Sequence, residues 1–64
     1  MNEIQKRRLE LGLTQVDLAK KLGVAVSTVG MWETAKRKPD IVMLKKLAVI
    51  LNCSADDLLS DIVI

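Results

Sequence analysis

The side chains that carry out most enzyme chemistry are scarce in this chain of 64 residues. It has no histidine and no tyrosine, and Cys53 is its single cysteine. Cys53 therefore has no disulfide partner within the chain and no histidine with which to bind zinc. General acid–base catalysis is equally hard to assemble from this composition. We expect a protein that is not an enzyme, that uses no metal or other cofactor, and that keeps Cys53 buried as a small apolar residue.

Positive charge is concentrated in one part of the sequence. Residues 1–46 contain all ten lysines and arginines against five acidic residues, a net charge of +5, whereas residues 47–64 contain three aspartates and no basic residue. The densest basic cluster is Lys36, Arg37 and Lys38. This separation of charge favours a face that is turned toward phosphate groups, although solvated helix surface is the ordinary explanation of a charged run.

Two short helical patterns on either side of Gly23 would position such a face. Thr14 and Asp17 have the spacing of a capping pair at a helix start, and Gly23 suits the left-handed conformation that ends a helix. In the second pattern, Val29 and Trp32 lie at helical spacing. We expect helices over about residues 15–22 and 26–34. Two helices joined by so short a turn form a helix-turn-helix, whose second helix enters the major groove of DNA.

Three further helices are expected around this pair. The first covers about residues 2–11 and buries Ile4 and Leu9. Its basic side chains are expected to point outward: Lys6, Arg7 and Arg8. The fourth starts at Pro39-Asp40 and ends at Asn52, with the apolar stripe Ile41, Leu44, Leu47, Ala48 and Leu51. The fifth is capped by Ser54 with Asp57, and Leu58 and Leu59 face inward.

These elements predict a single all-α domain over residues 1–64. Below about 70 residues the core is small, and without Phe or Tyr it must be built from Leu, Val, Ile, Ala and one Trp. No stretch approaches the roughly 18 apolar residues of a membrane span, and the N-terminal residues lack the apolar region of a signal peptide. We therefore expect a cytoplasmic protein that does not enter a membrane.

The ordered motifs of the chain resemble the Cro/CI-type (XRE, lambda-repressor-like) helix-turn-helix family over about residues 4–59. The residues that carry the resemblance are Thr14-Gln15, Leu18-Ala19, Leu22-Gly23-Val24, Ser27-Thr28-Val29, Trp32-Glu33 and Lys36-Arg37-Lys38-Pro39. The resemblance implies a compact five-helix DNA-binding domain. It also implies a sequence-specific transcriptional regulator of the phage or bacterial repressor type, which binds double-stranded DNA with the helix over about residues 26–34.

The family's groove-facing positions map onto Ala25, Val26, Ser27, Gly30 and Met31. Relatives usually carry Ser or Thr at the first of these positions and long polar side chains at others, so this chain departs from the pattern. We expect base contacts from Val26, Ser27 and Met31, with the apolar side chains meeting thymine methyl groups. The expected contacts to the DNA backbone come from Gln15, Thr28, Lys36, Arg37 and Lys38.

Several residues of the recognition helix are better explained by structure than by DNA binding. Trp32 is expected in the core, and Glu33 in an internal salt bridge for which Arg8 is a candidate partner. The family also implies that Gln15 braces this helix. Ala25 lacks the side-chain oxygen of a good helix cap, and Gly30 weakens a helix interior. Ala35 stands where many relatives have glycine, so the turn that follows is expected to be strained.

A second surface is suggested by surplus apolar residues. Val42 and Val49 are seven residues apart in the fourth helix, and with Ile62 and Ile64 they are candidates for a homodimer interface. A thicker core is an equally good explanation. The alternative function is that of an engineered or diverged helix-turn-helix scaffold, in which the apolar surface of helices 3 and 4 binds another protein and DNA binding is weak or lost.

Overall fold

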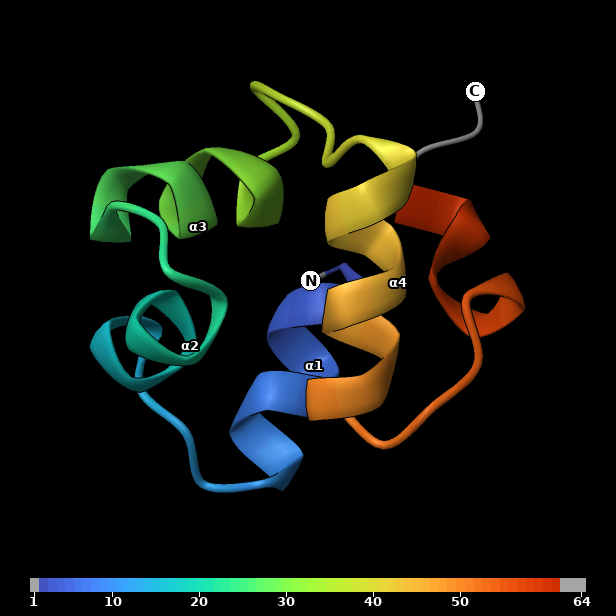
Figure 1. Cartoon of the computed structure of the whole chain (residues 1–64), viewed down its shortest axis with the longest axis horizontal. Helices are drawn as coiled ribbons and strands as arrows, with labels where there is room; N and C mark the ends of the chain where they lie inside the picture. Colours follow the sequence, from blue (N-terminus) through green and yellow to red (C-terminus); the bar gives the residue numbers. More distant parts are fainter. Residues whose placement is uncertain (1, 62–64) are drawn as a thin grey trace.

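The computed structural model describes residues 2–61, with no side-chain detail for Ser60 and Asp61. Within this range the chain forms four α-helices and one 3-10 helix, and no strand (Figure 1). The elements are α1 (Glu3–Glu10), α2 (Gln15–Leu22), α3 (Val26–Glu33), α4 (Ile41–Ile50) and η1 (Asp56–Asp61). The all-α class is confirmed. The expected fifth α-helix is instead 3-10, although Ser54 and Asp57 form the predicted reciprocal cap.

The helices begin where side-chain oxygens accept backbone N–H groups. The Asn2 side chain accepts from Gln5 at the start of α1, and the Asp40 side chain accepts from Met43 at the start of α4. At α2, Thr14 and Asp17 form the predicted capping box, with distances of 3.0 and 2.9 Å. These caps satisfy N–H groups that have no partner inside the helix.

The four α-helices within residues 2–61 also share one way of ending. After each, two successive N–H groups bond back to carbonyls of the last turn, as in a Schellman motif. The residue at the turn adopts positive φ in every case; these residues are Gly12, Gly23, Ala35 and Asn52. Ala35, with φ of 60°, is the one that is neither Gly nor Asn, so the predicted strain at this turn has a structural basis.

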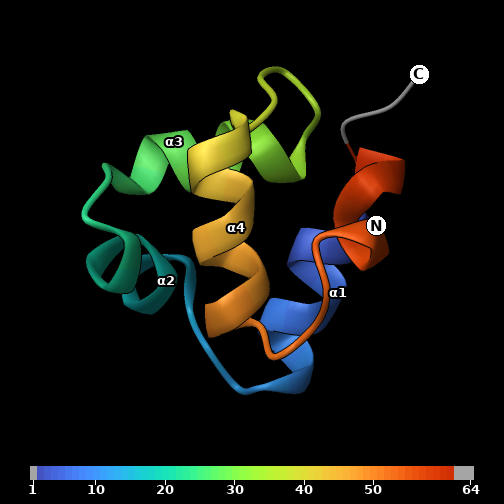
Figure 2. The ribbon, with the colours of Figure 1, turned by 45° about the vertical axis from the view of Figure 1, so that its right-hand side comes forward.

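The core lies where α1, α2, α3, α4 and η1 meet. In Figures 1 and 2, α2 and α3 form one side of the molecule, α4 crosses the middle, and η1 packs against α1 and α4. The fully buried large side chains come from all five elements: Ile4, Leu18, Val29, Leu44, Leu47 and Leu58. Trp32 is also buried, as predicted. Val24 packs partly against this core and anchors the turn before α3.

The predicted orientation of α1 is correct for the buried Ile4 and the exposed Lys6, but it is wrong for Arg8 and Leu9. Arg8 is only 7% exposed, whereas Leu9 is 49% exposed. Arg8 lies one helical turn after Ile4, on the face that packs against the rest of the domain, and its charge is balanced there by Glu33. The inner face of α1 is therefore occupied by the paired charge of Arg8, and Leu9 lies on the outer face.

Three smaller predictions about burial also need correction. Ile41 is exposed because it begins α4 at the edge of the core, and Leu59 is exposed on η1 beside the buried Leu58. Cys53 is half-buried against the core rather than fully buried, and this burial raises the pKa of its thiol.

Candidate nucleic-acid interface

The turn between α2 and α3 fixes how the two helices cross. Gly23, with φ of 73°, ends α2 in the left-handed conformation, and Ala25 is extended at the start of α3. Only Gly23, Val24 and Ala25 separate the helices. The two helices pack against each other, and α3 lies along the upper side of the molecule in Figures 1 and 2. This is the helix-turn-helix that the sequence predicts.

A buried network attaches the C-terminal end of α3 to α1 and α2. Arg8 donates from Nε to Glu33 Oε2 at 2.6 Å and from Nη2 to Glu33 Oε1 at 3.0 Å. A third donor, Nη1, reaches the carbonyl of Leu13 at 2.8 Å. The hydrogen bond to Glu33 raises the pKa of Arg8, so the guanidinium stays charged despite its burial. The predicted salt bridge between Arg8 and Glu33 is present, and it is bidentate.

Gln15 extends this network to α2. Its Nε2 donates to Glu33 Oε1 at 3.1 Å. It also lies beside Gly30, where a Cβ placed on the glycine would be 3.9 Å from the same nitrogen. Gln15 thus braces α3, as the family resemblance implies, from a half-buried position at the first residue of α2.

One further link to α3 was not predicted from the sequence. Asn2 Nδ2 donates to the carbonyl of Trp32 at 2.8 Å, while the Asn2 Oδ1 caps α1. This one side chain therefore joins the start of α1 to the end of α3. Thirty positions separate the two residues, so no local pattern could have indicated the bond.

The outward surface of α3 is uncharged. Glu33 is the only charged residue between Val26 and Glu33, and it is buried against Arg8. At the N-terminal end of this surface, Ala25, Val26 and Ser27 are exposed. Farther along the helix the surface is formed by half-buried residues: Thr28, Gly30 and Met31. The predicted base-contacting residues Val26, Ser27 and Met31 therefore lie on one helix with access to solvent.

The basic loop follows α3 directly. Lys36, Arg37 and Lys38 are all exposed, and Pro39 after them is buried. The loop is held to the helix at its start, because the N–H groups of Lys36 and Arg37 both bond to the carbonyl of Met31, at 2.9 and 3.2 Å. Figure 1 shows this loop leaving the C-terminal end of α3 before the chain enters α4. The structure thus places three positive charges next to the uncharged helix.

Two of the four candidate dimer residues lie within the described residues, on a different helix from α3. Val42 and Val49 lie on α4 and are 59% and 80% exposed. Ile62 and Ile64 lie outside the described residues. The equally good explanation of a thicker core does not hold for the two valines.

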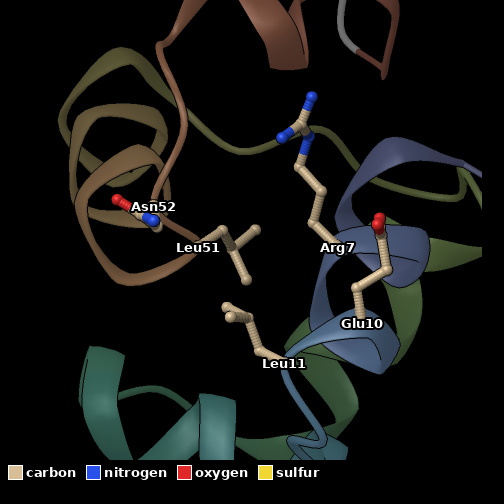
Figure 3. Close-up of a pocket in the computed structure, with 5 residues that line it drawn as sticks. All are labelled: Arg7, Glu10, Leu11, Leu51 and Asn52. Atoms are coloured by element: carbon tan, nitrogen blue, oxygen red, sulfur yellow. The ribbon is translucent and has the colours of Figure 1, made fainter.

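A shallow pocket of about 170 Å³ lies where the C-terminal ends of α1 and α4 meet. Figure 3 shows Leu11 and Leu51 facing each other, with Arg7 and Glu10 extending to one side. This volume is smaller than the roughly 300–1,000 Å³ of pockets that hold drug-sized ligands. In Figures 1 and 2 these helix ends lie at the bottom and α3 at the top, so the pocket is not part of the α3 surface.

None of the helices within residues 2–61 has the length and apolar character that a membrane span requires. Within the same range, no group of three or more Cys, Asp or Glu side chains is arranged to hold a metal ion.

The fold and the surface together define a helix-turn-helix protein of the type that binds DNA. Comparison with known proteins agrees: the helix-turn-helix family model matches residues 4–58, so the chain belongs to the Cro/CI-type helix-turn-helix family of transcriptional regulators.

Two relatives carry the same description. An uncharacterized HTH-type transcriptional regulator from Archaeoglobus fulgidus is 36% identical over 55 residues, covering 86% of this chain and 79% of its own. The uncharacterized HTH-type transcriptional regulator YazB from Bacillus subtilis is 43% identical over 47 residues, covering 73% of this chain and 68% of its own. No solved structure matches the sequence.

Proposed function

We propose that this protein is a sequence-specific DNA-binding transcriptional regulator of the phage or bacterial repressor type, in which α3 lies in the major groove. The observation that carries the proposal is the pairing of an uncharged, solvent-accessible helix with three exposed basic residues fixed at its end. The helix can approach base edges without bringing a carboxylate near phosphate, because Glu33 is buried and paired with Arg8. We further propose a cytoplasmic location, where DNA lies in cells without a nucleus.

In this proposal the contacts divide into two groups. Val26, Ser27 and Met31 meet base edges. The backbone contacts that set the register come from Gln15, Thr28, Lys36, Arg37 and Lys38. Gln15 is already oriented by its bond to Glu33, so binding a phosphate would cost it little side-chain entropy.

The test is fluorescence anisotropy against random duplex DNA, with salt raised in steps, followed by selection of the bound sequences. Lys36→Ala should weaken binding to all sequences about equally and reduce the salt slope by about 1. Ser27→Ala should change the preference between sequences instead. Lys45→Ala, an exposed lysine on α4, is the matched control and should leave the slope unchanged. If the Lys36 and Lys45 variants lost equal amounts of DNA affinity, the assigned role of the loop would be contradicted.

We also propose that the protein acts as a homodimer through Val42 and Val49, with Ile62 and Ile64 as further candidates. Exposure of two valines on one helix favours a partner surface. A two-fold pair would place the recognition helices about 34 Å apart, one turn of DNA. Sedimentation at micromolar concentration should show a dimer that Val49→Glu dissociates. A monomer that is unchanged by this substitution would refute the proposal.

The second candidate is a protein-binding scaffold, which is favoured by the exposed apolar residues of α3 and α4. It predicts no DNA binding even at low salt, with the helical fold intact by circular dichroism. Salt-sensitive binding that enriches particular sequences would exclude it as the principal function.

A further inference from the structure

We propose that α3 recognises the 5-methyl group of pyrimidines, and that the protein treats thymine and 5-methylcytosine as equivalent at the positions under Val26 and Met31. This inference rests on the proposed DNA-binding function and names the kind of site that it reads. It predicts that methylation of cytosine at these positions strengthens binding to the level given by thymine.

The side chains that α3 presents for contact with bases include two apolar ones. Val26 is 40% exposed at the first residue of α3, and Met31 is half-buried on the same helix. Neither side chain can form the bidentate hydrogen bonds by which Arg, Asn and Gln recognise purines. The feature in the major groove that complements an apolar side chain is the methyl group at pyrimidine C5.

The hydroxyl groups of α3 do not distinguish thymine from 5-methylcytosine. Thymine and 5-methylcytosine share the methyl group but differ at C4, where thymine has an acceptor oxygen and cytosine a donor amine. Ser27 and Thr28 carry hydroxyl groups that can donate or accept, so they tolerate both. The exposed surface of α3 has no amide, guanidinium or free carboxylate that would distinguish the two bases, because Glu33 is occupied by Arg8 and Gln15.

The backbone of α3 is held in place by hydrogen bonds to other parts of the protein. Contact with a single methyl group is short-ranged, so it discriminates only when the backbone position is fixed. α3 is fixed by the hydrogen bonds of Glu33 and by the bond from Asn2 to the Trp32 carbonyl. The apolar side chains are therefore presented at a defined distance from the groove.

The experiment uses the full chain and a duplex selected from random DNA, with one pyrimidine position at a time varied over four pairs. These are thymine with adenine, uracil with adenine, 5-methylcytosine with guanine, and cytosine with guanine. We expect the two methylated pyrimidines to bind alike, and each to bind about fourfold more tightly than its unmethylated counterpart for each contacted methyl group.

A protein variant assigns the effect to α3. Val26→Ser should bring the ratio between thymine and uracil close to one at the positions under that residue, while general salt-dependent binding remains. Leu9→Ser is the control, because this apolar side chain is also exposed but lies on α1, outside the residues assigned to DNA or dimer contacts, and it should leave the ratio unchanged. Circular dichroism of both variants checks that the fold is retained.

Two outcomes would overturn the inference in different ways. If thymine and uracil bind equally, and cytosine and 5-methylcytosine bind equally but differently from them, the base pair is read and the methyl group is not. The proposed function would then stand without this inference. If no duplex binds at low salt, the proposed function fails, and the inference fails with it.

Discussion

The two helices of the helix-turn-helix have the same length but are stabilised in different ways. α2 and α3 each contain eight residues. α2 begins with the capping box of Thr14 and Asp17 and ends at Gly23 with positive φ. α3 begins at Ala25 without a side-chain cap, contains Gly30, and ends before Ala35, an alanine with positive φ. The side-chain cap and the C-terminal glycine that stabilise α2 are both absent from α3, although the two helices share the backbone hydrogen bonds of the turn that ends them.

This comparison shows that α3 is stabilised by contacts with the rest of the protein rather than by its own helix-forming residues. The missing cap costs about 0.5–2 kcal/mol, and Gly30 costs about 1 kcal/mol relative to alanine. In return, α3 has Val29 and Trp32 in the core and Glu33 in a network with α1 and α2. Tertiary contacts on the inner face leave the outer face free to be chosen for binding.

The largest test of this comparison removes the tertiary support. Glu33→Ala leaves the buried charge of Arg8 without its carboxylate partner, with only the hydrogen bond to the Leu13 carbonyl remaining. Such a loss typically costs about 3–5 kcal/mol. A protein of this length has a total stability of only about 3–10 kcal/mol. We therefore expect the variant to be largely unfolded even without urea, as measured by circular dichroism at the start of a urea titration. The double variant Arg8→Met with Glu33→Leu should recover the fold, and a Glu33→Ala protein as stable as the parent would show that the network does not hold α3.

A smaller test supplies the missing cap. Ala25 is extended, with φ of −70° and ψ of 149°, which is the geometry that a capping serine adopts. Ala25→Ser should therefore increase the free energy of unfolding by about 1 kcal/mol. Thr14→Ala on α2 is the matched opposite and should decrease it by a similar amount. Failure of the serine to stabilise, with Thr14→Ala behaving as expected, would mean that α3 gains nothing from local capping.

The two helix ends give a reciprocal pair of substitutions. Ala35 and Gly23 occupy the same position in equivalent turns, with φ of 60° and 73°. A Cβ in the left-handed conformation costs about 1–2 kcal/mol, and replacing it with glycine costs part of that in chain entropy. Ala35→Gly should stabilise the protein by roughly 0.5–1 kcal/mol and Gly23→Ala should destabilise it by a similar amount. Thermal unfolding measures both, and shifts of equal sign would contradict the comparison.

The smallest expected effect is the dependence of the α2 cap on pH. The backbone N–H of Thr14, followed by its hydroxyl, lowers the pKa of Asp17 below its usual 3.8. A lowered pKa means that the carboxylate stabilises the fold above pH 3.8 and that this contribution is lost as the pH falls through the folded-state value. The stability of Asp17→Asn should therefore depend less on pH in this acidic range. If the free energy of unfolding of Asp17→Asn changed with pH as steeply as that of the parent protein, the effect would be excluded.

The accuracy of the sequence predictions follows the range of the interactions involved. Caps such as Thr14 with Asp17, and the strained turn at Ala35, depend on residues within a few positions and were predicted correctly. The orientation of α1 was not, because the preference for Arg8 over Leu9 at the inner face depends on Glu33, 25 positions away. Two incompatible expectations for Arg8 followed from the sequence, an outward position on α1 and an internal salt bridge with Glu33. The salt bridge proved correct.

The candidate site shows the same division. The positions of Val26, Ser27 and Met31 on one accessible helix follow from helical periodicity and the short turn, and the family match over residues 4–58 agrees with the motifs. The contacts of these residues with bases stay predictions, since a groove-facing position does not specify the base that it meets. The bond from Asn2 to Trp32 could not be predicted either, because it depends on the final packing of α1 against α3.

The central claim is that α3 and its basic loop, and not α4, form the surface that binds DNA. The most direct test is a titration of the isotope-labelled protein with a selected duplex, in which backbone amide shifts are followed residue by residue. We predict that the largest changes occur at residues 25–31 and 36–38, with small changes at the exposed residues of α4 between Val42 and Val49. Changes centred on α4, with α3 unaffected, would contradict the account.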